Sequence, residues 1–131
     1  MAHNLKLRNL VFILLGVLIL VFKRYYQGPL SDLIQNHGSN FSVSFATYYI
    51  ALMAFNQLPR PSLFSFIGSL LAVELFELTN GFGVMTNVYD PWDYLANFLG
   101  ISLAVGLDIT LDRFSARGEI DDEGIMDKNP G

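Results

Sequence analysis

The chain has 131 residues, a length that accommodates one domain. Hydrophobic residues make up 52% of it and charged residues only 15%, whereas soluble domains carry charge on about 25% of their residues. This composition favours a membrane protein over a soluble one. The lack of cysteine excludes disulfides, zinc–thiolate sites and thiol nucleophiles. The net charge of −4 comes mostly from residues 114–131, and the near-neutral remainder argues against binding to nucleic acid.

The first apolar run extends from Leu10 to Phe22 and has basic residues on both sides. Lys23 and Arg24 follow it directly, without the small-residue cleavage pattern that ends a secretory signal. We therefore interpret residues 7–26 as a retained first membrane helix, whose basic flanks reach towards the membrane surface.

Three further segments are apolar enough to be membrane helices, namely residues 41–56, 62–78 and 91–111. Two prolines within residues 57–61 forbid a continuous helix and predict a tight hairpin between the second and third segments. None of these runs alternates with a period of two, and a bilayer admits only helices or closed barrels. The sequence thus predicts an all-α membrane protein, a bundle of four transmembrane helices.

Residues 1–113 would form this transmembrane domain and residues 114–131 an acidic tail. With four spans, both termini lie on one side of the membrane. That side holds most of the basic residues, whereas the opposite side holds only Lys23 and Arg24. Basic residues concentrate on the cytoplasmic side of membrane proteins, so we expect both termini in the cytoplasm. The basic residues on that side are Lys6, Arg8, Arg60, Arg113, Arg117 and Lys128.

Residues 27–40 are expected to form a polar loop on the outer side. Ser39 or Asn40 would cap the second helix by accepting a hydrogen bond from a free backbone N–H group. His37 is the histidine of this loop. A lone loop histidine is usually only solvated, but His37 is the one histidine placed to join a site at this end.

Polar residues gather where the third segment ends and the fourth begins. Glu74 and Glu77 are three residues apart and share a helix face. Asp93 and Asn97 begin a stripe on the fourth helix that continues through two small residues, Gly100 and Ala104. At 1.5 Å per residue the two arms reach the same depth, so we expect Glu74 to meet Asn97 and Glu77 to meet Asp93. Carboxylates that face each other in a low dielectric require a shared proton or a bound cation.

The start of the fourth helix also has a simpler interpretation. Asp90 and Pro91 form an N-terminal signature, in which the aspartate accepts hydrogen bonds and the proline occupies the first helical position. Asp90 is therefore either only a helix cap or a member of the site. Asp108, with Asp112 and Arg113, is expected at the cytoplasmic interface.

The order and spacing of these polar residues resemble the VanZ-like family of small multi-pass bacterial membrane proteins. The resemblance covers about 30 residues and the hydropathy profile, and it implies a membrane fold in the bacterial inner membrane and a role in the cell envelope, without an established reaction. The family usually has an arginine shortly before the aspartates, where this sequence has residues 86–88, Thr-Asn-Val, so we expect a net acidic cluster. The matching residues are Glu74, Glu77, Asp90, Asp93, Asn97 and Gly100.

The sequence therefore predicts a non-catalytic integral membrane protein that binds a polar or cationic envelope ligand. The alternative is a small accessory subunit of a larger membrane complex, in which the polar stripe only packs helices. An intramembrane enzyme with a hard metal ion is a third interpretation, although no nucleophile motif, phosphate loop or metal signature supports it. No cofactor is indicated. The candidate ligand-binding residues are Glu74, Glu77, Asp93, Asn97 and His37, with Asp90 as cap or site residue.

Overall fold

The computed structural model describes residues 2–79, 83 and 90–126, and its side chains over residues 6–79, 83 and 90–120. The described part is helical and contains no strand, which confirms the all-α prediction. A short 3-10 turn, Lys23–Tyr25, follows the first helix. The four α-helices are α1 (Ala2–Phe22), α2 (Ser31–Ala54), α3 (Pro61–Leu78) and α4 (Pro91–Met126).

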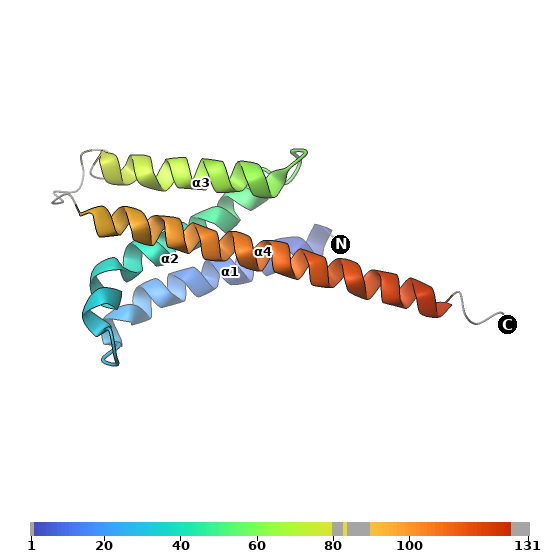
Figure 1. Cartoon of the computed structure of the whole chain (residues 1–131), viewed down its shortest axis with the longest axis horizontal. Helices are drawn as coiled ribbons and strands as arrows, with labels where there is room; N and C mark the ends of the chain where they lie inside the picture. Colours follow the sequence, from blue (N-terminus) through green and yellow to red (C-terminus); the bar gives the residue numbers. More distant parts are fainter. Residues whose placement is uncertain (1, 80–82, 84–89, 127–131) are drawn as a thin grey trace.

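Successive helices run in opposite directions, and α2 lies at the centre of the arrangement (Figure 1). It packs against α1, α3 and α4, while α3 also packs against α4. The N-terminus and the turn between α2 and α3 lie at one end of the bundle. The start of α2, the end of α3 and the start of α4 lie at the other, and the C-terminal part of α4 extends beyond the other helices (Figure 1).

Several helix boundaries agree with the prediction. The proline-containing turn separates α2 from α3, and Pro61 occupies the first turn of α3. Pro91 opens α4 as its sequence signature indicates. However, α4 does not end near residue 111. It continues to Met126, so most of the expected acidic tail is helical, and residues 127–131 lie outside the described part.

The expected loop over residues 27–40 is wrong, because α2 begins at Ser31, ten residues before the predicted start. The predicted capping by Ser39 or Asn40 is wrong for the same reason, since both lie inside the helix. The residue that precedes the helix is Leu30, which adopts a left-handed backbone conformation (φ 62°) and makes no side-chain cap hydrogen bond. Residues 36–40 therefore lie within α2, and His37 is positioned by a helix rather than by a loop.

Two glycines allow close contact with α2. A Cβ atom at Gly16 of α1 would lie 3.0 Å from the Ser42 carbonyl oxygen and 3.1 Å from the Ala46 Cβ. At Gly100 of α4, a Cβ atom would overlap the Phe41 carbonyl oxygen. Only glycine permits backbones to approach this closely, as at small-residue contacts between membrane helices.

The core is built mainly from α2. Tyr48 and Tyr49 are fully buried, and their rings pack edge to face with centroids 5.3 Å apart. Phe12 of α1 stacks on Tyr49 with centroids 4.8 Å apart, which joins α1 to the centre. Val73 and Ile101 contribute from α3 and α4. These contacts pack α1, α3 and α4 against α2 in the middle of the bundle.

Polar side chains are buried and large apolar side chains are exposed over much of the bundle. Among the described residues, α3 and residues 91–120 of α4 are long and apolar enough to cross a membrane. Most large apolar side chains of α1 from Leu7 to Phe22 are exposed. A water-soluble bundle has the opposite distribution, because its apolar faces are buried. The buried polar residues are Asn9, Ser42, Ser44, Ser65, Ser69, Asn97 and Asp108.

Candidate functional site

The first turn of α4 positions two aspartates. The Trp92 backbone N–H donates a 3.0 Å hydrogen bond to Asp90 Oδ1, and the Asp93 N–H donates to the Asp90 carbonyl oxygen. Asp90 therefore caps α4, as the sequence indicates. Its other carboxylate oxygen, Oδ2, faces His37, so the capping residue is also part of the surrounding cluster.

His37 lies on α2 opposite this turn. Its Nδ1 atom is 2.9 Å from Asp93 Oδ1, and its Nε2 atom is 4.0 Å from Asp90 Oδ2. One ligand atom from each of the three side chains lies within 4.8 Å of the other two. Three side chains at this separation can surround one small cation. The histidine reaches this position because α2 starts early.

Both predicted pairs between α3 and α4 are present. The Glu74 side chain lies beside that of Asn97, and the Glu77 side chain lies beside that of Asp93. Glu77 Oε1 also accepts a 3.2 Å hydrogen bond from Asn40 Nδ2. The six predicted residues therefore form one group, here called the acidic cluster: His37, Glu74, Glu77, Asp90, Asp93 and Asn97.

The inner edge of the acidic cluster is buried. Asn97 is almost inaccessible, and its Oδ1 atom accepts a 2.7 Å hydrogen bond from Ser44. Glu74 Oε2 is buried and makes no hydrogen bond within the described residues. A buried carboxylate oxygen without a partner is costly, and a cation or a proton donor would satisfy it.

Asn40 and Ser44 were not among the predicted site residues. Both lie on α2, which was expected to begin only at residue 41. Once α2 is extended to Ser31, His37, Asn40 and Ser44 fall at steps of three and four and share one helix face. This spacing is the signal in the sequence that identifies them.

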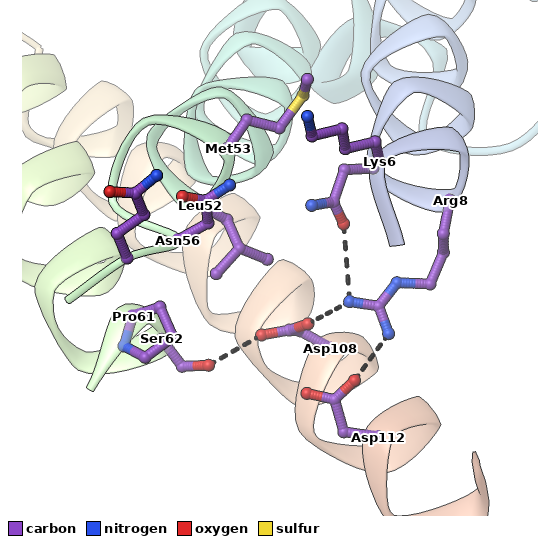
Figure 2. A pocket seen from close by; sticks show the side chains of 11 residues that line it. Lys6, Arg8, Leu52, Met53, Asn56, Pro61, Ser62, Asp108 and Asp112 are labelled. Atoms are coloured by element: carbon purple, nitrogen blue, oxygen red, sulfur yellow. Dashed lines mark hydrogen bonds and ion pairs between the residues drawn. The ribbon is translucent and has the colours of Figure 1, made fainter. Parts of the chain in front are cut away.

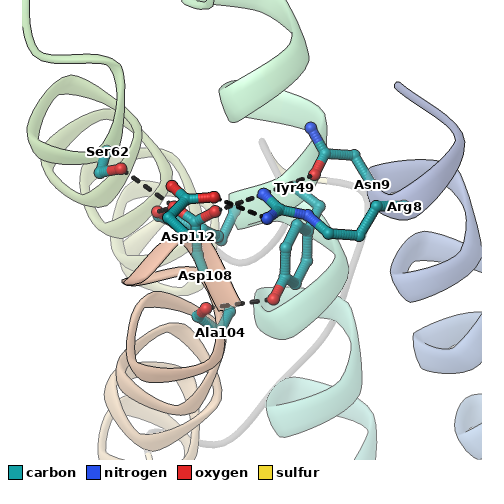
Figure 3. A network of polar contacts seen from close by, with 8 residues as sticks. Arg8, Asn9, Tyr49, Ser62, Ala104, Asp108 and Asp112 are labelled. Carbon is teal, nitrogen blue, oxygen red and sulfur yellow. Dashed lines mark hydrogen bonds and ion pairs between the residues drawn. The ribbon is translucent and has the colours of Figure 1, made fainter. Parts of the chain in front are cut away.

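A second polar region, the Asp108 network, occupies the other end of the bundle (Figure 3). Asp108 is only 1% exposed, and Arg8 Nη2 lies 2.6 Å from its Oδ1 atom. Its Oδ2 atom accepts hydrogen bonds from Tyr48 (2.7 Å) and Ser62 (2.9 Å). Arg8 also reaches Asp112 at 2.7 Å. Side chains from all four helices thus meet at one carboxylate.

The sequence predicts Asp108 near the cytoplasmic interface, and the structure additionally buries its side chain between the helices. The stripe of residues 93, 97, 100 and 104 predicts this position, since one more step of four along the helix gives 108. The Tyr49 hydroxyl donates to the Ala104 carbonyl oxygen at 3.1 Å, so the stripe faces α2 along this length as well. The partner that makes burial tolerable, Arg8, is 100 residues away in sequence.

A cavity of about 480 Å³ adjoins the Asp108 network (Figure 2). Its charged lining residues are Lys6, Arg8, Asp108 and Asp112, whose formal charges cancel. Because Arg8 is held by both aspartates, the lining offers no unbalanced charge to an ion. We interpret the Asp108 network as a connection between the helices, and the acidic cluster as the candidate site.

No protein-family model, curated protein or solved structure matches the chain.

Proposed function

We propose that this chain is an integral membrane protein whose four helices all cross the bilayer. The exposed apolar side chains of α1, α3 and α4 support this, because lipid is the solvent that tolerates them. The inward-facing polar residues support it as well, since polar groups in a bilayer face the bundle interior. At 1.5 Å per residue, α1 and α2 are about 31 and 36 Å long, enough for a hydrocarbon core of about 30 Å.

The proposed orientation places both termini in the cytoplasm of a bacterial inner membrane. Lys6, Arg8, Arg60 and Arg113 lie near the end that carries the Asp108 network, whereas the acidic cluster lies at the opposite end. Basic residues remain on the cytoplasmic side, so the acidic cluster would face the cell envelope.

The proposed activity is non-catalytic binding of a polar or cationic envelope ligand at the acidic cluster. The observation that carries it is the convergence of four carboxyl groups and His37 on one end of the bundle, with a buried oxygen of Glu74 that has no hydrogen-bond partner in the described residues. The Lys23 ammonium group donates to the Gln35 carbonyl oxygen rather than to a carboxylate of the acidic cluster. The cluster is therefore net acidic and attracts cations.

Membership of the VanZ-like family remains part of this proposal. The residues that carry the resemblance have physical reasons for their positions here. Asp90 caps α4, Asn97 binds Ser44 and lies beside Glu74, and Gly100 allows contact with α2. These roles are those of a positioned polar site and are compatible with ligand binding.

Ligand binding can be tested with the full chain in phosphatidylcholine nanodiscs. We expect saturable binding of Mn²⁺ or ethanolammonium by calorimetry, weakened at least tenfold in Glu74→Ala, Asn97→Ala and Asp93→Asn. Asp32→Asn is the control, because Asp32 is an exposed acid in the first turn of α2 outside the acidic cluster. Binding of neither cation, or equal binding by all variants, would contradict the proposal.

A second candidate function is an accessory subunit of a larger membrane complex. The observation that favours it is the extension of α4 beyond the bundle, where Phe114 and Ile120 are 64% and 69% exposed. A partner subunit would cover these side chains. Native gel migration after mild solubilisation should then show a complex that Phe114→Ser weakens, and a monomer from the native membrane would contradict this candidate.

A further inference from the structure

An apolar groove of about 420 Å³ lies beside the acidic cluster, between α1, α2 and α4. Nearly all of its lining is apolar. His37 is the exception, and it is also the residue that contacts Asp93 and faces Asp90. The groove therefore ends at the acidic cluster. Its other lining residues are Ile19, Leu33, Ile34, Gly38, Phe41, Trp92, Leu95, Ala96 and Leu99.

The charges at this end of the groove have opposite signs on its two sides. Asp90 and Asp93 lie on the α4 side and face His37 of α2. Lys23 lies on the α1 side, where its Cδ atom is 3.4 Å from the position of a Cβ atom at Gly38. Lys23 uses one hydrogen-bond donor on the Gln35 carbonyl oxygen at 2.8 Å, which leaves two donors of its ammonium group for another acceptor.

This arrangement fits one class of amphiphile. An acyl chain matches the apolar groove, a phosphate matches Lys23, and an ammonium group matches the aspartates. A primary ammonium donates up to three hydrogen bonds, whereas a quaternary ammonium donates none. The carboxylate acceptors of Asp90 and Asp93 therefore favour a primary amine.

We propose that the groove and the adjoining side chains of Lys23, His37, Asp90 and Asp93 bind one phospholipid whose headgroup ends in a primary ammonium. The proposal rests on the proposed function and names its ligand class: the cationic group at the acidic cluster belongs to a membrane lipid. The lipid enters sideways from the bilayer, since the groove is formed by helix surfaces that also carry exposed apolar side chains.

The fluorescence of Trp92 can report which lipid occupies the groove. Trp92 is the only tryptophan of the chain and it lines the groove. The full chain is reconstituted in phosphatidylcholine vesicles that contain a small, fixed fraction of lipid with brominated acyl chains, which quench tryptophan fluorescence on contact. The brominated lipid carries an ethanolamine, choline or glycerol headgroup on identical chains. We expect the ethanolamine lipid to quench Trp92 at least twofold more strongly than the other two.

Variants separate the headgroup from the groove. Asp93→Asn should abolish the preference for ethanolamine, whereas Asp32→Asn should retain it. Gly38→Leu should reduce quenching by the ethanolamine lipid to the level of the others, because it fills the groove. The substitution is compatible with the helix, since a Cβ atom there meets only ordinary contacts. Circular dichroism and the unfolding midpoint verify that each variant folds.

The failure of this inference is distinguishable from the failure of the proposed function. Equal quenching of the wild-type chain by the three brominated lipids would overturn the lipid assignment. If soluble ethanolammonium still binds and Asp93→Asn still weakens it, the acidic cluster is a cation site for a ligand other than lipid. If the wild-type chain binds neither soluble cation and the three brominated lipids quench Trp92 equally, both proposals are wrong.

Discussion

At the scale of single residues, Asp108 shows how a buried charge is held in this bundle. One of its oxygens binds Arg8 and the other accepts from Tyr48 and Ser62, so both carboxylate oxygens have partners. Burial of a charge is tolerated only with such compensation. Removal of the carboxylate also leaves the partner groups without an acceptor.

Replacement of Asp108 by alanine should therefore destabilise the protein by about 3 kcal/mol or more. The Tyr48 and Ser62 hydroxyls and one Arg8 nitrogen would lose their acceptor in a buried site. The measurement is the free energy of unfolding in SDS titrations of detergent-solubilised protein, followed by circular dichroism. Asp112→Ala is the control, because Asp112 is 53% exposed and its ion pair should contribute at most about 1 kcal/mol. Equal losses in the two variants would contradict this account.

Ser44 offers a test within the acidic cluster. It is fully buried and donates to Asn97, whereas Thr47, three residues on, donates to a carbonyl of its own helix. Ser44→Ala should cost about 1 kcal/mol, because it leaves Asn97 Oδ1 without a donor. Thr47→Ala should be nearly neutral in the same unfolding assay. A neutral Ser44→Ala would show that the Ser44–Asn97 hydrogen bond does not stabilise the fold.

At the scale of helices, the contact between α2 and α4 positions both polar regions. α2 supplies His37 and Ser44 to the acidic cluster and Tyr48 to the Asp108 network. α4 supplies the acceptors opposite them. The two backbones approach closely at Gly100, where there is no room for a Cβ atom beside the Phe41 carbonyl oxygen.

Gly100→Ala should destabilise the protein by about 1–3 kcal/mol, because the new methyl group overlaps the Phe41 carbonyl oxygen and separates the helices. Gly106→Ala on the same helix is the matched control. A Cβ atom at Gly106 meets nothing within 4 Å, and alanine favours a helix over glycine by about 0.5–1 kcal/mol. The two substitutions should therefore have opposite signs in the unfolding measurement, and a stabilising Gly100→Ala would be incompatible with the close contact.

At the scale of the whole molecule, the two polar regions lie at opposite ends of an apolar bundle. An aromatic core separates them, with Tyr48 and Tyr49 at its centre. In the proposed orientation the Asp108 network faces the cytoplasm and the acidic cluster faces the envelope. The bundle then presents its binding site on one side of the membrane only.

Because the chain has no cysteine, the proposed topology can be mapped with single engineered cysteines. Tyr25→Cys should react with a membrane-impermeant maleimide in cells whose inner membrane is intact. Gln57→Cys and Ser115→Cys should react only after the membrane is permeabilised. All three positions are exposed in the bundle, so a lack of reaction reports the side of the membrane. Reaction of Gln57→Cys in intact cells would contradict the proposed four-span arrangement.

The sequence by itself determined the helical class, the turn before α3, the start of α4 at Pro91 and the pairing of Glu74 with Asn97 and Glu77 with Asp93. These features follow from local composition and helical spacing, which a single segment contains. The four-span topology and the bound ligand stay predictions.

Only the tertiary structure decided the start of α2 and the pairing of Asp108 with Arg8. Residues 31–40 are mostly polar, so hydropathy does not identify them as part of a membrane helix, and α2 packs along α1 and α4. That contact brings His37 to Asp93, 56 residues away, and Arg8 to Asp108, 100 residues away. A buried charge becomes favourable only when such a distant partner is in place, and spacing along one helix does not identify that partner.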